Sequence, residues 1–174
     1  MNIVAPSVLE TDRLTLRLPG SSDTQAVLDF LRSERAAFYG GPMSEYDAWH
    51  KYSAYVGQWI LCGYGMFSVV LKDTGETVGM AGPFHPSHFA EPEMSWLLTG
   101  ERFEGRGYAA EACGAVLTHL FTTLGWKNVV SYIDISNEGS RKLAERLGAR
   151  LESDPPCPVA NCDSYRHYPQ GGTS

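Results

Sequence analysis

The stretch Glu101-Arg-Phe-Glu-Gly105-Arg-Gly107-Tyr-Ala-Ala-Glu-Ala112 is the most informative part of this sequence. A strand-like run at 93–98 precedes it, and a long amphipathic run to about Leu124 follows it. Glycines let the backbone come close to an anion, and the free N–H groups of a first helical turn then face its charge. Strand, glycine loop and helix start, in this order, predict a loop that binds a pyrophosphate.

Length and charge limit the class of protein. The chain has 174 residues, a normal size for one domain, and a formal net charge of −6. The acidic balance argues against sequence-independent binding of nucleic acid, which needs a basic surface. It agrees with a cationic substrate, because net charge biases the encounter between molecules. We therefore expect no nucleic-acid partner.

The expected location follows from segments that the sequence lacks. The first residues have neither the basic nor the apolar part of a signal peptide, and no apolar run approaches the roughly 18 residues of a membrane span. We therefore expect a cytoplasmic protein without a membrane partner. In that compartment Cys62, Cys113, Cys157 and Cys162 are expected to be reduced thiols.

Apolar periodicity divides the chain into alternating strands and helices. Strands are predicted at 13–18, 65–71, 77–82, 93–98, 127–134, 149–152 and 164–168. Helices are predicted at 22–31, with Ser22 and Gln25 as a capping box, at 44–62, at 108–124, and at 137–147, with Asn137 as N-cap and Ser140 at N3. Without a repeat or a linker, this is one α/β domain over 1–170, followed by a disordered tail at 171–174.

The glycine loop also fits a dinucleotide fingerprint. Gly105-x-Gly107-x-x-Ala110 has the G-x-G-x-x-A form, and Asp134 ends the next strand, roughly where a ribose-binding acid stands. However, the six residues from Thr99 to Glu104 separate the fingerprint from its strand. The part of the chain that follows is also too short for a doubly wound domain. A nicotinamide-dependent oxidoreductase is therefore a distant alternative.

A second interpretation of the glycine loop accounts for more of the chain. Arg102-x-x-Gly105-x-Gly107, followed by Tyr-Ala-Ala-Glu-Ala, resembles the acyl-CoA pyrophosphate loop of the GNAT N-acetyltransferase superfamily. The segments 9–17, 137–149 and 165–167 resemble parts of its ribosomal-protein-alanine acetyltransferase-like branch. This resemblance implies an α/β (α+β) GNAT fold. Such a fold has a mixed, mostly antiparallel sheet of about seven strands, flanked by four helices, with two splayed central strands.

The resemblance also implies acetyl-CoA as cosubstrate, without a metal. The pantetheine arm would pair with the backbone of a strand, as an added β-strand does, and the pyrophosphate would take N–H groups of the loop. Asn137 would contact the pantetheine or acetyl end besides capping its helix, and the two arginines would otherwise be solvated loop residues. The residues expected to bind the cosubstrate are Trp96, Leu97, Leu98, Arg102, Gly105, Arg106, Gly107, Tyr108, Ala109, Ala110 and Asn137.

The implied reaction is attack of a primary amine on the thioester, which needs a base because the amine arrives as ammonium. Glu93, at the start of the strand beside the expected gap, is the favoured base, and Glu91, His85 and His88 are alternatives. The Ser140 hydroxyl is expected to assist the leaving thiolate. Many GNAT enzymes use a tyrosine for this purpose, at a position that is Ala144 in this chain.

Several questions stay open at this stage. The acceptor is a protein N-terminal amine or a small-molecule amine, and the protein is a monomer or a homodimer. A non-catalytic acyl-CoA-binding module of the same fold is the alternative function. His85-x-x-His88 and Cys157-x4-Cys162 do not complete a four-ligand set, so no metal site is expected. Trp49, Tyr52, Tyr55 and Trp59 have helical spacing and are expected in the core or beside the acceptor.

Overall fold

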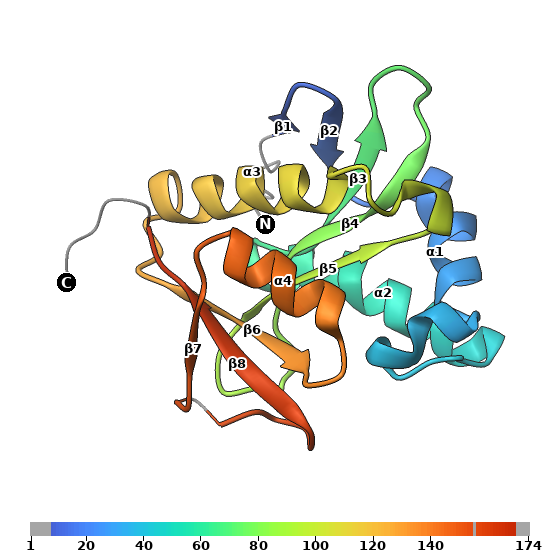
Figure 1. Ribbon diagram of the computed structural model, residues 1–174. Coiled ribbons are helices and arrows are strands. Elements are labelled where there is room, and N and C mark those ends of the chain that lie inside the picture. Colours follow the sequence, from blue (N-terminus) through green and yellow to red (C-terminus); the bar gives the residue numbers. More distant parts are fainter. Residues whose placement is uncertain (1–7, 155, 170–174) are drawn as a thin grey trace.

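The computed structural model describes residues 8–154 and 156–169 (Figure 1). The tail expected at 171–174 lies outside the described residues. The described elements are β1 Leu9–Glu10, β2 Leu14–Arg17, η1 Ser21–Asp23, α1 Thr24–Leu31, η2 Glu34–Tyr39, α2 Glu45–Cys62, β3 Phe67–Leu71, β4 Thr77–Phe84, β5 Glu93–Leu98, η3 Glu101–Phe103, α3 Tyr108–Thr122, β6 Val129–Asp134, α4 Glu138–Arg146, β7 Arg150–Glu152 and β8 Cys162–His167.

The described strands form one eight-stranded sheet in the order β1-β2-β3-β4-β5-β6-β8-β7. Only β5 and β6 pair in parallel, and the other neighbours are antiparallel. The expected mixed, mostly antiparallel sheet is therefore confirmed. This topology also excludes the doubly wound alternative, which needs a mostly parallel sheet.

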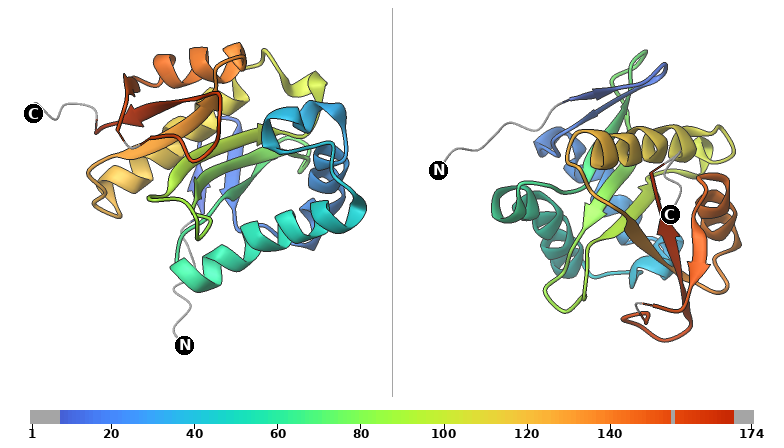
Figure 2. Two further views of the ribbon diagram at one scale, coloured as in Figure 1. Left: turned by 90° about the horizontal axis from the view of Figure 1, so that it is seen from below. Right: turned by 90° about the vertical axis from the view of Figure 1, so that its left-hand side faces the viewer.

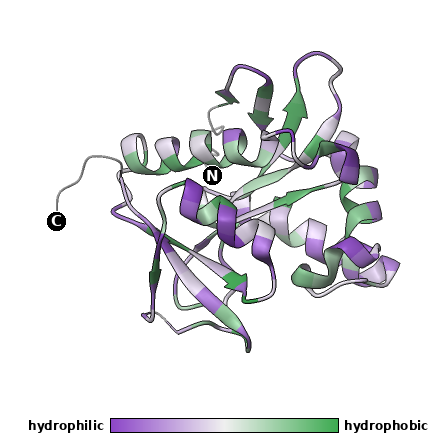
Figure 3. Ribbon diagram, viewed as in Figure 1, coloured by the Kyte–Doolittle hydropathy of each residue, from purple (hydrophilic) through white to green (hydrophobic). Residues whose placement is uncertain are grey.

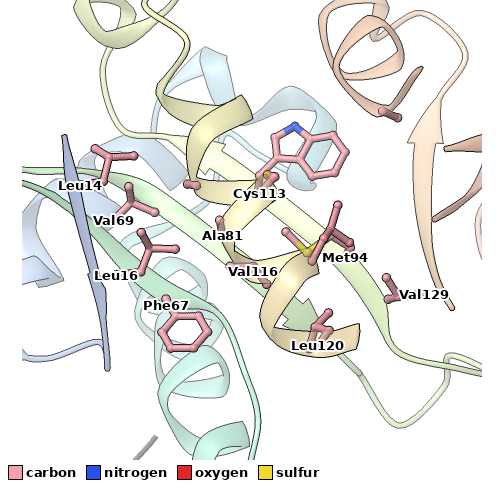
Figure 4. Packing of buried hydrophobic residues seen from close by; sticks show 14 of the residues in the cluster. Leu14, Leu16, Phe67, Val69, Ala81, Met94, Cys113, Val116, Leu120 and Val129 are labelled. Atoms are coloured by element: carbon pink, nitrogen blue, oxygen red, sulfur yellow. The ribbon is translucent and has the colours of Figure 1, made fainter. Parts of the chain in front are cut away.

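Each face of the sheet carries its own hydrophobic core. Against one face α3 and α4 pack, in a cluster that includes Leu14, Phe67, Cys113 and Val116 (Figure 4). Against the other face α1 and α2 pack, around residues such as Phe30 and Tyr55. Figure 2 (left) shows α2 and α4 on opposite sides of the sheet. In Figure 3, α4 is coloured mostly as hydrophilic, which agrees with Ala144 being its one buried side chain.

A short strand, β1, precedes the first expected strand and is separated from it by a turn. Thr11 makes a turn between β1 and β2: its N–H donates to the Leu14 carbonyl oxygen at 2.9 Å, and its hydroxyl oxygen accepts the Leu14 N–H at 2.9 Å. These local bonds separate β1 from the alternating run that forms β2. The sheet therefore has eight strands rather than about seven.

The capping box expected at Ser22 is wrong. The carboxylate of Asp23 instead makes the hydrogen bonds at the start of this helical segment. Asp23 is fully buried and accepts hydrogen bonds from Arg17, Ser68, Thr77 and the Gly20 N–H at 2.6–2.9 Å. Burial alone would raise the pKa of this carboxyl, but its hydrogen bonds lower it. Asp23 thereby ties β2, β3 and β4 to the start of α1.

Two of the four cysteines are not free thiols. Cys157 and Cys162 form a disulfide, with Cα atoms 5.9 Å apart, within the range that a disulfide spans. The loop after β7 folds back to place Cys157 beside the first residue of β8. Cys62 and Cys113 are free, and Cys113 is buried. The expectation of four reduced thiols is therefore wrong for this pair.

The two central strands separate soon after they meet. Glu93 opposite Val130 is the one register pair of β5 and β6. One residue further on, the Ser131 hydroxyl donates 2.6 Å to the Met94 carbonyl oxygen, in place of a backbone bond. Beyond this point the strands diverge towards the glycine loop after β5 and the start of α4 after β6. The expected splay is therefore present, and it opens where the candidate site residues lie.

Candidate active site

The free edge of β5 faces this gap. The Thr99 N–H donates to the Val78 carbonyl oxygen. In the antiparallel β4–β5 pair, this bond determines which residues of β5 direct their backbone N–H and C=O groups towards β4. Leu97 therefore directs its backbone groups to β4, whereas Trp96 and Leu98 direct theirs to the gap. The backbone N–H groups of Trp96 and Leu98 are thus placed to pair with an added strand. This register does not support the same role for the backbone of Leu97.

Side chains from η2 donate hydrogen bonds to the backbone carbonyl groups on that edge of β5. The Tyr39 hydroxyl donates to the Trp96 carbonyl oxygen, and the Arg35 guanidinium donates to that of Leu98 at 3.2 Å. Neither Tyr39 nor Arg35 was among the residues expected from the sequence. They lie 57 and 63 positions away from their partners, so no local pattern connects them.

A cavity of about 720 Å³ extends from this strand edge to the glycine loop. Its lining includes most elements of the expected cosubstrate site. The lining residues are Phe30, Arg35, Phe38, Tyr39, Trp96, Leu97, Leu98, Glu101, Glu104, Gly105, Ala109, Asn137, Gly139, Ser140 and Leu143.

The glycine loop has the geometry that an anion-binding loop requires. Gly105 and Gly107 have φ of 69° and 81°, a region that glycine adopts without strain. A side chain at 105 would meet nothing within 4 Å, so this side of the loop is open. Gly107 is the N-cap of α3 and offers no side chain, which leaves the N–H groups of Tyr108, Ala109 and Ala110 facing outward. The residues present therefore fit the pyrophosphate of an acyl-CoA.

A clamp from the first hairpin holds this loop in place. The Arg13 guanidinium donates 2.9 Å to the Arg106 carbonyl oxygen and 2.7 Å to the Glu111 carboxylate, and it lies over the Tyr108 ring. Thr11 donates 2.6 Å to the same carboxylate. The sequence pattern gave no sign of this clamp, because Arg13 and Glu111 are 98 positions apart.

The side chains of the two loop arginines lie outside the cavity of about 720 Å³. Arg102 is mostly exposed, pairs with Glu76 and covers the Phe103 ring. Arg106 is exposed, and its described contact is made by its backbone. Neither arginine lines the cavity. Arg35, which is paired with Glu104, is the arginine that does.

A second cavity, of about 370 Å³, meets the first. The residues that line both are Phe38, Tyr39, Trp96, Asn137 and Ser140. Rings of Tyr55, Phe84, Phe89 and Tyr132 form much of the wall. Tyr52 and Tyr55 are thus buried as expected, whereas Trp49 is exposed. Two adjoining cavities suit a reaction between two substrates.

The second cavity contains the carboxyl group of Glu93. Burial raises the pKa of Glu93 to about 7, against the opposing effects of the Lys51 ammonium and a backbone hydrogen bond from Tyr132. A carboxyl with such a pKa can accept a proton at neutral pH and release it again. Lys51, on α2, lines the same cavity and was not expected from the sequence.

The other base candidates are less suitable. Glu91 is held by Arg166 through two hydrogen bonds of 3.0 and 2.9 Å. The ring nitrogens of His85 are both engaged, at 3.2 Å, with the Tyr64 hydroxyl and the Phe89 carbonyl oxygen. His88 is exposed, although it lines the cavity. Glu93 is therefore the best-placed base.

Asn137 and Ser140 lie where the cavities meet. The Asn137 side chain accepts the Ser140 N–H at 3.1 Å, so its expected role as N-cap of α4 is confirmed. The Ser140 side chain lines both cavities. Ala144, by contrast, is fully buried in the core.

Residues 8–154 and 156–169 contain neither a cluster of metal ligands nor a membrane-spanning helix. No group of three or more His, Cys, Asp or Glu residues is arranged to hold a metal ion there. Within the same residues, no helix has the length and apolar character that crossing a bilayer requires.

A sheet that splays beside a glycine loop, with a second cavity adjoining the first, defines a class of cofactor-dependent group-transfer proteins. Comparison with known proteins specifies the family. The model of the acetyltransferase (GNAT) domain matches residues 13–150. The chain therefore belongs to the GNAT acetyltransferase family.

Solved structures of acetyltransferases are similar over almost the whole chain. An acetyltransferase of Agrobacterium tumefaciens str. C58 is 37% identical, with 94% of this chain and 95% of that chain covered, at a TM-score of 0.88. A GNAT-family acetyltransferase of Bordetella pertussis is 31% identical, with 92% and 98% covered, at a TM-score of 0.75. A ribosomal L7/L12 α-N-protein acetyltransferase in complex with coenzyme A is 16% identical, with 93% and 98% covered, at 0.74, and shares the fold.

Proposed function

We propose that this protein transfers the acetyl group of acetyl-CoA to a primary amine, by direct attack within a ternary complex. The observation that carries the proposal is the Glu93 carboxyl group. Its pKa is about 7, and it lies in a cavity that adjoins the candidate cosubstrate site. A base with this pKa is half ionised at the pH at which it would act, as general-base catalysis favours.

The cosubstrate, when bound, supplies an acetyl thioester. The free β5 edge at Trp96 and Leu98 would bind its pantetheine arm, and the N–H groups from Gly105 to Ala110 would bind its pyrophosphate. One of the two strand N–H groups would also polarise the thioester carbonyl. Binding of coenzyme A by a GNAT enzyme of the same fold supports this choice of cosubstrate.

Each remaining step has a residue suited to it. Glu93 removes a proton from the amine, directly or through one water. Ser140 donates a hydrogen bond to the leaving thiolate. Loss of the usual tyrosine at Ala144 is tolerable, because a thiol leaving group has a pKa of about 8.5 and needs little acid assistance. The protein is accordingly proposed to act as an N-acetyltransferase on a small-molecule amine or a protein N-terminus.

The test is release of free CoA thiol from acetyl-CoA in the presence of a panel of primary amines. Glu93→Gln should lower kcat/KM by about 10²–10⁴-fold, with acetyl-CoA affinity unchanged. In the wild type, kcat/KM should fall about tenfold per pH unit below about pH 7, because protonation of Glu93 removes the base.

Glu91→Gln is the matched control. It makes the same change two positions away, on a carboxylate held by Arg166 outside the second cavity. We expect this variant to keep its activity. Tight binding of acetyl-CoA without thiol release on any amine would instead favour the non-catalytic acyl-CoA-binding module.

A further inference from the structure

Lys51 is an unusual cation for the wall of an apolar cavity. Its ammonium lies 5.1 Å from the centre of the Phe84 ring and 5.7 Å from that of the Tyr55 ring. Among residues 8–154 and 156–169, it makes no hydrogen bond, and no carboxylate oxygen lies within 4.0 Å of its nitrogen. Lys51 therefore has aromatic faces as neighbours but no directly bonded anion.

The surroundings of Lys51 disfavour the charged form of its ammonium group. Burial lowers the pKa of Lys51, and the carboxylate of Glu93, in the same cavity, acts in the opposite direction. A partly buried cation is stabilised when an anion pairs with it. An anionic group brought in by a ligand would supply that pairing, and the aromatic rings would exclude water around it.

The other groups in the cavity limit what else such a ligand carries. Glu93 is suited to bind the ammonium form of an amine. Asp134 also lines the cavity, but its carboxylate accepts a 2.8 Å hydrogen bond from the Ser136 N–H and another from the Ser136 hydroxyl. The rest of the wall is largely aromatic or apolar. The cavity volume of about 370 Å³ lies at the small end of the range for ligand sites.

We propose that the acceptor is an amino acid with an apolar or aromatic side chain. Its ammonium group would face Glu93, its carboxylate would pair with Lys51, and its side chain would contact the rings of Tyr55, Phe84 and Phe89. Glu93 and Lys51 form no ion pair with each other within 4.0 Å, so both can bind the opposite charges of a zwitterion in the cavity that they line. This inference rests on the proposed acetyl transfer and names its substrate class.

The reaction balances with these groups alone. A C–N bond forms between the amine and the acetyl carbon as the C–S bond breaks. The ammonium loses two protons in all: one passes through Glu93 to solvent, and one converts the thiolate to free CoA thiol. The acid group of the acceptor is unchanged and stays paired with Lys51.

The test uses three acceptors that share a benzyl side group and a primary amine: phenylalanine, phenylalaninamide and phenethylamine. The last two lack the carboxylate. We expect the wild type to have at least about tenfold higher kcat/KM for phenylalanine than for phenethylamine. Lys51→Met should lower this ratio about tenfold relative to the wild type, and Lys51→Arg should retain most of it.

Comparing the ratio between variants cancels the different intrinsic reactivities of the three amines. A wild type that prefers the amide or the simple amine would overturn the proposal, and would point to a peptide N-terminus or a plain amine. An equal fall in kcat/KM for all three acceptors in Lys51→Met would also overturn the proposal. Lys51 would then act only through its charge on Glu93.

A binding measurement separates this inference from the proposed function. In the presence of CoA, N-acetylphenylalanine should raise the Tm of the wild type, whereas N-acetylphenethylamine should not, and Lys51→Met should lose the effect. This pattern without any turnover would uphold the Lys51 site and reject the transferase. Turnover of many amines without a preference for the carboxylate would do the reverse.

Discussion

The carboxyl group of Glu93 lies where burial opposes its charge, so the feature that suits it to catalysis also weakens the fold. Burial raises its pKa from 4.5 to about 7. The folded-state pKa thus lies above that of the unfolded chain. The destabilisation is absent below about pH 4.5, grows as the pH rises, and is complete above about pH 7.

Glu93→Gln should therefore stabilise the protein in a pH-dependent way. One pKa unit corresponds to 1.36 kcal/mol, so the gain at about pH 8 should be about 3 kcal/mol and should nearly vanish at about pH 4. Urea denaturation at the two pH values measures it. A gain of equal size at both would show that the carboxyl is not desolvated, and would remove the argument for Glu93 as base.

At the residue scale, the sequence predicts the site in part. Glu93, Asn137 and Ser140 were predictable, because each has a fixed place at the start of a strand or helix. Lys51 and Tyr39 were not, because they reach the site from α2 and η2 through tertiary packing. The roles expected for Arg102 and Arg106 stay predictions, and the structure gives them little support, since local charge does not determine where a long side chain points.

At the element scale, the start of α3 depends on the conformation of Gly107. Its φ of 81° is one that side chains rarely adopt, and a side chain there would come within 3.4 Å of the Arg13 guanidinium. The Arg13–Glu111 clamp fixes the orientation of the outward-facing N–H groups. Loop, helix start and clamp therefore act as one element.

Gly107→Glu should abolish acetyl-CoA binding in a folded protein. The substitution adds bulk, backbone strain and a negative charge where a pyrophosphate is expected, and calorimetry would measure the loss. Gly75→Glu is the control: Gly75 also has a positive φ, of 71°, but lies in the β3–β4 turn with open space around it. Wild-type affinity in a folded Gly107→Glu variant would contradict the placement of the cosubstrate.

The elements themselves were largely predictable from the sequence. Short apolar runs identified the strands from β3 to β6, and the cap Asn137 identified the start of α4. The break between β1 and β2 was missed because a single threonine makes it. The cap predicted at Ser22 was wrong because Asp23 accepts hydrogen bonds from side chains on three strands. A local sequence pattern contains no information about such long-range contacts.

At the scale of the whole molecule, the sheet consists of two parts joined at one place. The strands β1 to β5 form one part, and β6, β8 and β7 form the other. The Glu93–Val130 pair and the Ser131 side chain connect them. Ser131 is fully buried, and its oxygen also lies 3.0 Å from the Nε2 of His167.

Ser131→Ala should weaken this junction. It leaves the Met94 carbonyl oxygen and the His167 ring nitrogen without this partner, at a cost of about 1–3 kcal/mol in the free energy of unfolding. Ser53→Ala, on the exposed face of α2, makes the same change and should stay within about 0.5 kcal/mol. Equal denaturation midpoints for both variants would show that the junction does not depend on Ser131.

The single pair between β5 and β6 has a consequence for how the molecule moves. If the two parts of the sheet open and close to admit one molecule and release another, they rotate about the place where they are joined. Glu93 is itself one half of that joint, so it lies at the pivot, where displacement is smallest. The carboxyl group of Glu93 would then keep its position while the far ends of β5 and β6 move. The group whose position matters most for proton transfer would therefore lie where the motion is smallest.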